Sequence, residues 1–403
     1  MVATCWGLTR ELCDSAQSRR AGAGGRPHAK RALLRRIDPA VAALTILALA
    51  VSSYHLGTRS LAYDELVSEA HARLGMHGLW VIVSHQDTNM SLYYVLLHFW
   101  VRIFGHGAVA LRSLSVIFGG LAVPVTVLLG KRLFGRETGL VAGLLLALSP
   151  FFVFWEQFAR SYSLVVLLVA LSSYFLVAAL ERPSRAMRIG YVLAIVVAIL
   201  AHYFAAYVLL VQVLTLLAVK RRAALTREWL SVWAVASVVC IGLAVETFTG
   251  TGTHGISWIH PPPVRWLFGL PVQLAGGSNT IGRLTAAALV TLGCYGFVRV
   301  LADRPRWRVG FVAAWCVVPV LLDFAVSRLV QPMFLAYYLI VVLPAFLLLA
   351  AAGLVRLPRR AAGIIVLLAL VVLSAVGTFS GVETPSSRHG HPSAAASASR
   401  GVT

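Results

Sequence analysis

The sequence is poor in charged residues. Only 12% of its 403 residues are charged, whereas soluble proteins run near roughly 25%. Apolar runs of about 15–22 residues recur along the chain, and runs of that length cross a bilayer as helices. They exclude a soluble globular domain, and a membrane β-barrel does not produce them. The sequence therefore predicts an all-α, polytopic membrane protein.

The sequence also lacks the usual signatures of a nucleotide site or a metal site. It has no glycine-rich nucleotide loop, and its five cysteines show neither zinc-ligand spacing nor a clear disulfide pair. The net charge of +20 would suggest nucleic acid in a soluble protein. Basic loops that orient membrane helices explain that charge here. We therefore expect no nucleic-acid partner and no certain cofactor.

The chain divides into a basic tail, a membrane domain and a second polar tail. Residues 1–36 are polar and basic, which predicts a disordered cytoplasmic tail. Residues 37–380 form the predicted membrane domain, with a first outer loop at 58–109 and a second at 248–280. Residues 381–403 are rich in Ser, Ala, Gly and His, a composition that is typical of disorder.

Basic residues predict the orientation of the spans. The apolar runs lie at 40–57, 90–104, 110–130, 138–154, 161–180, 189–219, 229–247, 281–300, 309–327, 333–354 and 361–380. The basic connectors lie at 131–136, 182–188, 220–227, 299–308 and 356–360. With the N-terminal tail they hold 25 of the 35 Lys and Arg residues, and the positive-inside rule places them in the cytoplasm. A signal peptide with a cleavage-like Ala48-Leu49-Ala50 is an alternative for the first run.

That orientation predicts about eleven spanning helices, with the N-terminus inside and the C-terminus outside. It requires the run at 189–219 to cross twice, with His202 and Tyr203 at its outer turn. It also requires the segment 90–104 not to cross. Four polar residues at helical spacing form one stripe on this segment: Ser91, Tyr94, His98 and Arg102. Such a helix is expected to lie in the membrane interface with its apolar face down.

Two polar segments interrupt the apolar scaffold at its predicted outer edge. The first runs from Leu61 to Glu69 and contains three carboxylates, those of Asp64, Glu65 and Glu69. The second is His85-Gln86-Asp87-Thr88-Asn89. The first segment has a plain explanation as a solvated loop end that caps a helix. The motifs that follow it favour a functional site.

Those motifs are specific as an ordered set. They are Tyr63-Asp64-Glu65, Ala110-Leu111-Arg112-Ser113-Leu114-Ser115, Gly130-Lys131-Arg132-Leu133-Phe134-Gly135, Leu148-Ser149-Pro150-Phe151 and Glu156-Gln157-Phe158-Ala159-Arg160-Ser161-Tyr162. In this order and spacing the set resembles the GT-C membrane glycosyltransferases. The most similar group contains the protein O-mannosyltransferases, the lipid A aminoarabinose transferases and their bacterial relatives. The resemblance covers roughly residues 40–355 and is strongest from Tyr63 to Leu180.

The resemblance implies a reaction at the outer face of the plasma membrane. These enzymes use a sugar on a polyprenyl phosphate, and their first outer loop carries an Asp and two juxtamembrane helices. The chain departs from the pattern at two places. Relatives often have His-Pro-Pro-Leu-Tyr where this chain has Asn89-Met90-Ser91-Leu92-Tyr93-Tyr94. Many also have Arg before Tyr-Leu in a late helix, where this chain has Tyr337.

The implied chemistry assigns roles to residues. A sugar on a lipid phosphate is already activated, so the acceptor hydroxyl needs a base, and Asp64 is the best candidate. Glu65 would orient the acceptor or a divalent metal. Arg160 and Arg328 would face the departing phosphate, because an arginine fork matches phosphate geometry. Direct displacement with one base inverts the anomeric carbon. The remaining expected substrate-binding residues are Tyr63, His85, Asp87, Asn89, Glu156 and His202.

Two of these residues also have simpler structural explanations. Arg160 follows Glu156 by four residues, which is also the spacing of an ordinary helix ion pair. His202 at a hairpin tip is commonly just an interfacial polar residue. For the whole chain we expect an inverting glycosyltransferase, with mannose as a candidate sugar and a protein, lipid or glycan as acceptor. A lipid or glycan transporter and a non-catalytic relative are the alternatives, although no internal repeat typical of transporters is found.

Overall fold

The computed structural model of the chain describes residues 38–379, apart from 183, 225 and 250–257. The chain separates after Ala42 into two units, and the first contributes only residues 38–42, where helix α3 begins. All other described residues belong to the second unit. The two predicted tails, 1–36 and 381–403, lie outside the described residues.

Regular structure in the described residues is helical throughout, which confirms the all-α prediction. The first half contains α3 (Pro39–Ser53), α4 (Tyr63–Arg73), α5 (Met76–Val81), α6 (Ser91–Phe104), α7 (Ala108–Phe134), α8 (Arg136–Ala147), α9 (Pro150–Glu156) and α10 (Tyr162–Glu181). The second half contains α11 (Arg185–Ala201), α12 (Ala205–Ala224), α13 (Arg227–Thr249), α14 (Arg265–Leu274), α15 (Thr280–Asp303), α16 (Arg306–Leu329), α17 (Leu343–Val355) and α18 (Arg360–Phe379). Short helical turns η1 (Ile82–Gln86) and η2 (Thr88–Met90) precede α6, and η4 (Tyr338–Val342) precedes α17.

Several of these helices are long and apolar enough to cross a bilayer. Within the described residues, six helices satisfy this test alone, and a seventh span results if α8 and α9 act as one broken helix. Helix α3 and the apolar stretches Ala205–Val219 of α12 and Trp229–Gly242 of α13 are shorter. The predicted double crossing breaks at His202, between α11 and α12. The chain is a multi-pass membrane protein, and the total of eleven spans stays a prediction.

Close contacts at glycine hold the bundle together. A Cβ placed on Gly130 of α7 would lie 2.7 Å from the Cα of Gly139 in α8. Similarly, a Cβ on Gly296 of α15 would lie 2.5 Å from the backbone nitrogen of Gly353 in α17. Small residues allow such close approach between membrane helices, where dispersion contacts replace the hydrophobic effect.

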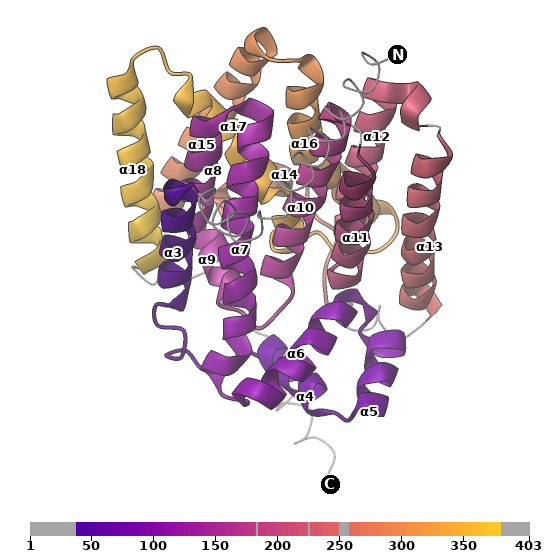
Figure 1. Cartoon of the computed structure of the whole chain (residues 1–403). Helices are drawn as coiled ribbons and strands as arrows, with labels where there is room; N and C mark the ends of the chain where they lie inside the picture. Colours follow the sequence, from indigo (N-terminus) through magenta and orange to yellow (C-terminus); the bar gives the residue numbers. More distant parts are fainter. Residues whose placement is uncertain (1–37, 183, 225, 250–257, 380–403) are drawn as a thin grey trace, which may run out of the picture. The chain divides into compact units, whose positions relative to one another are not determined.

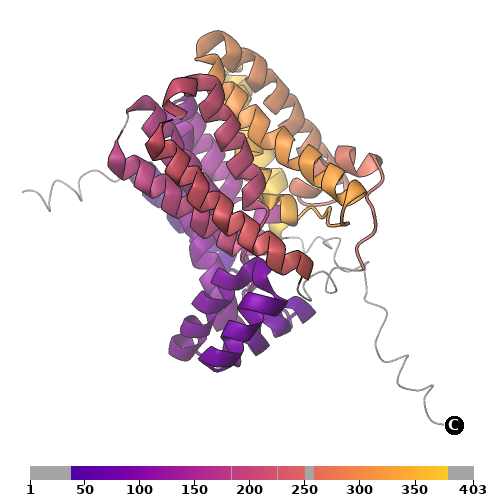
Figure 2. The same cartoon turned by 90° about the vertical axis from the view of Figure 1, so that its right-hand side faces the viewer.

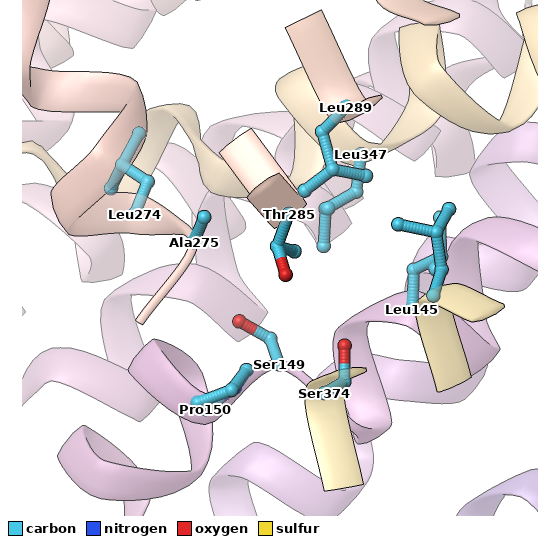
Figure 3. Close-up of a pocket in the computed structure, with 10 residues that line it drawn as sticks. Leu145, Ser149, Pro150, Leu274, Ala275, Thr285, Leu289, Leu347 and Ser374 are labelled. Atoms are coloured by element: carbon cyan, nitrogen blue, oxygen red, sulfur yellow. The ribbon is translucent and has the colours of Figure 1, made fainter. Parts of the chain in front are cut away.

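The α8–α9 break also borders a small cavity. Ser149 caps α9 by accepting a hydrogen bond from the backbone N–H of Phe152 at 3.3 Å, and the two helices meet at 60°. The cavity beside this break has a volume of about 10 Å³, and the hydroxyl-bearing side chains of Ser149, Thr285 and Ser374 border it (Figure 3). That volume holds about one water molecule. The cavity is therefore too small to be a substrate site.

The basic connectors gather at one end of the bundle. Glu181 pairs with Arg132 at 2.8 Å and with Arg308 at 3.0 Å, while Arg356 pairs with Asp303 at 3.3 Å. Helices α4, α5 and α6 lie at the opposite end, below the long helices in both views (Figures 1 and 2). This separation agrees with the predicted arrangement of basic connectors on one side and acidic segments on the other.

Helix α6 carries the predicted polar stripe, and the structure shows what covers it. Tyr94 and His98 are buried inside the protein, whereas Arg102 is exposed. The His98 Nδ1 lies 3.1 Å from the carbonyl oxygen of Ala72, and Arg102 donates a hydrogen bond to the carbonyl of Leu74 at 3.4 Å. Apolar side chains such as Ile103 are exposed instead. The stripe therefore joins α6 to α4, since unpaired carbonyls at the end of α4 need donors.

Candidate active site

Glu65 and Arg112 form a buried ion pair at the base of the first loop. Arg112 is 2% exposed and Glu65 is 0% exposed. The guanidinium donates from Nε and Nη2 to the two carboxylate oxygens, each at 2.7 Å. The same oxygens accept the backbone N–H groups of Ala62 and Ala159, each at 3.1 Å. Glu65 therefore has every acceptor position occupied by the protein and is not available to orient an acceptor or a metal.

Arg112 also fixes the chain that enters α4. Its two terminal nitrogens donate to the carbonyl oxygens of Leu56 and Arg59, at 2.9 and 3.0 Å, and of Ser60, at 3.0 Å. Because Glu65 joins this group to α4, the first turn of that helix is held on α7. Asp64 lies on the same turn, so this buried pair determines where its carboxylate can point.

Asp64 lies near Arg160, which follows α9. The Asp64 side chain is partly exposed. Burial disfavours the charge on Arg160, yet neighbouring tyrosine hydroxyls and the carboxylates of Asp64 and Asp87 raise its pKa well above the ordinary value. The Nε of Arg160 is buried and has no hydrogen-bond partner within the described part of the chain. Arg160 is therefore a permanent cation whose Nε–H is available to donate a hydrogen bond.

A hydrogen-bonded chain connects Arg160 to the second polar segment. Arg160 Nη1 donates to the Tyr94 hydroxyl at 3.0 Å, and that hydroxyl donates to the carboxylate of Asp87. The His71 ring packs edge-on against Tyr94, with ring centroids 4.9 Å apart. The pKa of His71 is lowered, mainly by burial. The Asp87 carboxylate opposes this shift, and the Arg160 charge adds to it. Helices α4 and α6 and the loop before α10 thus supply one polar cluster.

Glu156 does not belong to this cluster. Its side chain is 1% exposed, accepts a hydrogen bond from Ser52 of α3 and lies against Gly119 of α7. Among the described residues, no ion pair joins it to Arg160. The simple helix-pair explanation of Arg160 is therefore wrong, and Glu156 is a buried contact between helices.

Aromatic side chains line the other side of the cluster. The ring of Tyr337 lies 5.5 Å from Tyr162, 4.8 Å from Tyr338 and 4.7 Å from Trp155, measured between centroids. The His202 ring lies 6.0 Å from Tyr162 and 5.3 Å from Tyr338. Tyr337 is the position at which the resemblance leads one to expect arginine. In this chain its ring packs against Trp155, Tyr162 and Tyr338 instead.

The other predicted residues are dispersed. Asn89 accepts the backbone N–H of Tyr203 at 3.1 Å, so it holds the α11–α12 turn. Arg328 donates to the carbonyl of Pro262 at 3.3 Å and is exposed. Tyr63 is 68% exposed, and His85 is also exposed. The hydrogen bonds of Asn89 to Tyr203 and of Arg328 to Pro262 do not join the Arg160 cluster.

No metal centre is apparent in the part of the chain that the structure describes. No group of three or more His, Cys, Asp or Glu side chains there could hold an ion. The carboxylates of Asp64 and Asp87 both act on Arg160.

Three participants were missed by sequence reasoning as site residues: Arg112, Tyr94 and Tyr338. Arg112 lay in a recognised motif, and that membership was the available signal. Tyr94 lies in the polar stripe of the segment 90–104, and the stripe was its only signal. Tyr338 lay beside a departure from the family pattern and gave no signal of its own.

Comparison with known proteins supports the fold. Residues 91–245, less than half of the chain, match the family described as dolichyl-phosphate-mannose-protein mannosyltransferase. ArnT from Cupriavidus metallidurans, solved with undecaprenyl phosphate, is 20% identical with a TM-score of 0.60, and the match covers 80% of this chain and 61% of ArnT. The apo oligosaccharyltransferase of Archaeoglobus fulgidus is 12% identical with a TM-score of 0.52, covering 84% of this chain and 56% of that one. No curated protein sequence matches.

These likenesses show a shared fold. The chain shares the polytopic helical fold of ArnT and of the archaeal oligosaccharyltransferase, a fold that its motifs predicted. It spans less than two thirds of the length of either solved relative.

Proposed function

From this shared fold, we propose that the protein is a glycosyltransferase that moves a sugar from a polyprenyl-phosphate donor to an acceptor hydroxyl. The observation that carries the proposal is the hydrogen-bonded chain from Arg160 through the Tyr94 hydroxyl to Asp87, with the Asp64 carboxylate of α4 within electrostatic range of Arg160. Ionisable groups at membrane depth are usually functional. ArnT, which has this fold, was solved with undecaprenyl phosphate, and that supports a lipid-linked donor.

In this proposal Arg160 receives the donor phosphate. As the bond from C1 to phosphate breaks, the leaving phosphate gathers negative charge, and a fixed guanidinium stabilises that charge. The unpartnered Nε of Arg160 leaves donor capacity for it. The Tyr94 hydroxyl on Nη1 restricts how the guanidinium can turn. Arg328 is exposed and donates to the carbonyl of Pro262, so the proposal does not depend on it.

Asp64 acts as the general base. Its carboxylate is partly exposed, so an acceptor can approach it, and it is within electrostatic range of Arg160. It removes the proton of the acceptor hydroxyl as the oxygen attacks C1, and phosphate leaves from the opposite face. One displacement inverts the anomeric carbon, and no second carboxylate nucleophile is needed.

The reaction takes place at the outer face of the plasma membrane. The basic connectors occupy the opposite end of the bundle, and the positive-inside rule assigns that end to the cytoplasm. Asp64 and Arg160 then face outward, the N-terminus is inside, and a protein, a lipid or a glycan is the acceptor. Mannose is the first sugar to test, because the matched family is described as using it.

The donor class can be tested with purified protein in proteoliposomes. We expect label to move to an acceptor from undecaprenyl-phosphate [³H]mannose or an epimer, and not from a nucleotide sugar. Glu69→Gln is the matched control, because Glu69 lies on α4 but pairs with the exposed Arg73. A transporter would carry intact lipid across the bilayer without release of polyprenyl phosphate. Transport without release would contradict the proposal.

A further inference from the structure

Two buried polar side chains near the Arg160 cluster, His202 and Asp323, each have one atom without a hydrogen-bond partner among the described residues. His202, at the α11–α12 turn, is 1% exposed, and Asp323 of α16 is 0% exposed. His202 Nε2 and Asp323 Oδ2 have no hydrogen-bond partner in the described chain. Buried polar atoms in native proteins nearly always have partners, so two orphans in one region require an explanation.

Aromatic contacts link the two side chains. The His202 ring lies 5.3 Å from Phe204, and Phe204 lies 5.2 Å from Tyr207. The Tyr207 hydroxyl donates to Asp323 Oδ1 at 3.5 Å, a long hydrogen bond. Tyr338 contacts both the His202 and Phe204 rings, with centroids 5.3 and 5.1 Å apart. The orphaned atoms therefore border one aromatic cluster from the α11–α12 turn, α12 and η4, and Asp323 reaches it from α16.

This cluster continues the Arg160 site. Tyr162, the second residue after Arg160, lies 6.0 Å from His202 between ring centroids. The Tyr338 hydroxyl is within electrostatic range of Arg160, Asp64 and Asp323 alike. Tyr207, Tyr337 and Tyr338 are only half-buried, so part of each ring stays accessible. A ligand whose phosphate meets Arg160 would therefore place its adjoining group against these rings.

The orphaned atoms differ in hydrogen-bond character. His202 Nδ1 accepts the backbone N–H of Phe204 at 3.4 Å, so the proton of a neutral imidazole is on Nε2, which is a donor. Burial, with a further contribution from the charge of Arg160, lowers the pKa of His202 to about 3, so the ring is neutral at physiological pH. Asp323 Oδ2 is an acceptor when ionised. A hydroxyl group both donates and accepts, so a polyhydroxylated ring satisfies both atoms.

We propose that His202 and Asp323, with Tyr207 and Tyr338, form the subsite that reads the hydroxyl groups of the transferred sugar. This inference rests on the proposed function. The aromatic rings pack against the apolar face of the sugar, while His202 and Asp323 bind its hydroxyls. Arg160 contacts the phosphate that every donor shares, so this subsite decides which sugar is preferred.

The subsite is tested by comparing lipids that share a phosphate and differ in sugar. Affinities are measured by microscale thermophoresis for undecaprenyl phosphate and for its mannosyl, glucosyl and galactosyl derivatives. We expect wild type to bind one sugar lipid more tightly than undecaprenyl phosphate. Asp323→Asn and His202→Phe should each weaken that sugar lipid about tenfold, the value of a hydrogen bond to a buried polar group. Binding of undecaprenyl phosphate should change by less than about twofold, since it makes no sugar hydrogen bond.

Two further variants separate recognition from folding. His202→Gln retains an N–H near the place of Nε2 and should restore most of the sugar preference. Thr285→Val alters a buried, unpartnered hydroxyl beside the cavity of Figure 3, away from the subsite, and should leave both affinities unchanged. An equal loss for sugar lipid and undecaprenyl phosphate, or an unaltered preference in both Asp323→Asn and His202→Phe, overturns the subsite. If wild type binds none of the four lipids, both the proposed function and the subsite are contradicted.

Discussion

The substitution Glu65→Gln removes one charge from the buried pair that holds α4. The Glu65 carboxylate accepts two hydrogen bonds from Arg112 at 2.7 Å and two from backbone N–H groups at 3.1 Å. Glutamine has the same shape, but one acceptor oxygen becomes an amide donor. That donor faces Arg112 or a backbone N–H, and the Arg112 charge loses its counter-ion in a site that is 2% exposed.

The expected loss of stability is large. Removal of one partner from a buried ion pair destabilises by about 3–5 kcal/mol, because the other charge stays buried without compensation. The matched control is Glu69→Gln on the same helix. Glu69 pairs with Arg73 at 2.6 Å, but the Arg73 side chain is 59% exposed. Exposed pairs of this spacing contribute about 0.3–0.5 kcal/mol.

The assay is denaturant unfolding of both variants in one detergent, followed by sugar transfer at a temperature where each is folded. We expect the unfolding midpoint of Glu65→Gln to fall far more than that of Glu69→Gln. We also expect slower transfer by Glu65→Gln, because Asp64 shares its helical turn. Equal stability of the two variants would refute the assignment of Glu65 as a structural residue.

Three shorter predictions concern the phosphate, the topology and the α11–α12 turn. Arg160→Lys keeps the charge but loses the fork, so the donor KM in the transfer assay should rise about tenfold; a wild-type KM would remove Arg160 from the phosphate site. In a cysteine-free background, Glu137→Cys, at an exposed position beside a basic connector, should resist an impermeant thiol reagent added outside, and rapid labelling would contradict the orientation. His202 has a lowered folded pKa of about 3, so between pH 6.5 and 3 the unfolded state binds the extra proton and stability falls as pH falls, by up to about 1.4 kcal/mol per pH unit. Unfolding of His202→Gln measured across that window should show a shallower slope, and an unchanged slope would mean that His202 is not the group responsible.

Local patterns in the sequence predicted much of the fold. Apolar runs predicted the long helices. The predicted orientation required the run at 189–219 to cross twice, and the helices do break at His202. The spacing of basic residues predicted which connectors share an end, and the ion pairs of Glu181 confirm this for two of them. These features depend on composition within one segment, which a sequence shows directly.

Pairings between distant segments could not be predicted. Glu65 is separated from Arg112 by 47 positions, and Ser52 from Glu156 by 104. Nothing local distinguishes an acid that binds a buried arginine from one that faces substrate, so Glu65 was assigned beside Asp64. For a related reason, the sequence could not show that Tyr94 and His98 in the polar stripe of α6 are buried. Periodicity gives the face of a helix but not whether water or a neighbouring helix covers it.

The central claim is that Asp64 removes the proton of the acceptor, and one measurement tests it most directly. Donor Kd and single-turnover transfer rate are determined separately for wild type and Asp64→Asn. Asparagine keeps the size of the side chain but cannot accept the proton, so the rate should fall by about 100-fold or more. Donor affinity should change little, because the acceptor proton takes no part in donor binding. A wild-type transfer rate in Asp64→Asn would contradict the account and remove Asp64 from the mechanism.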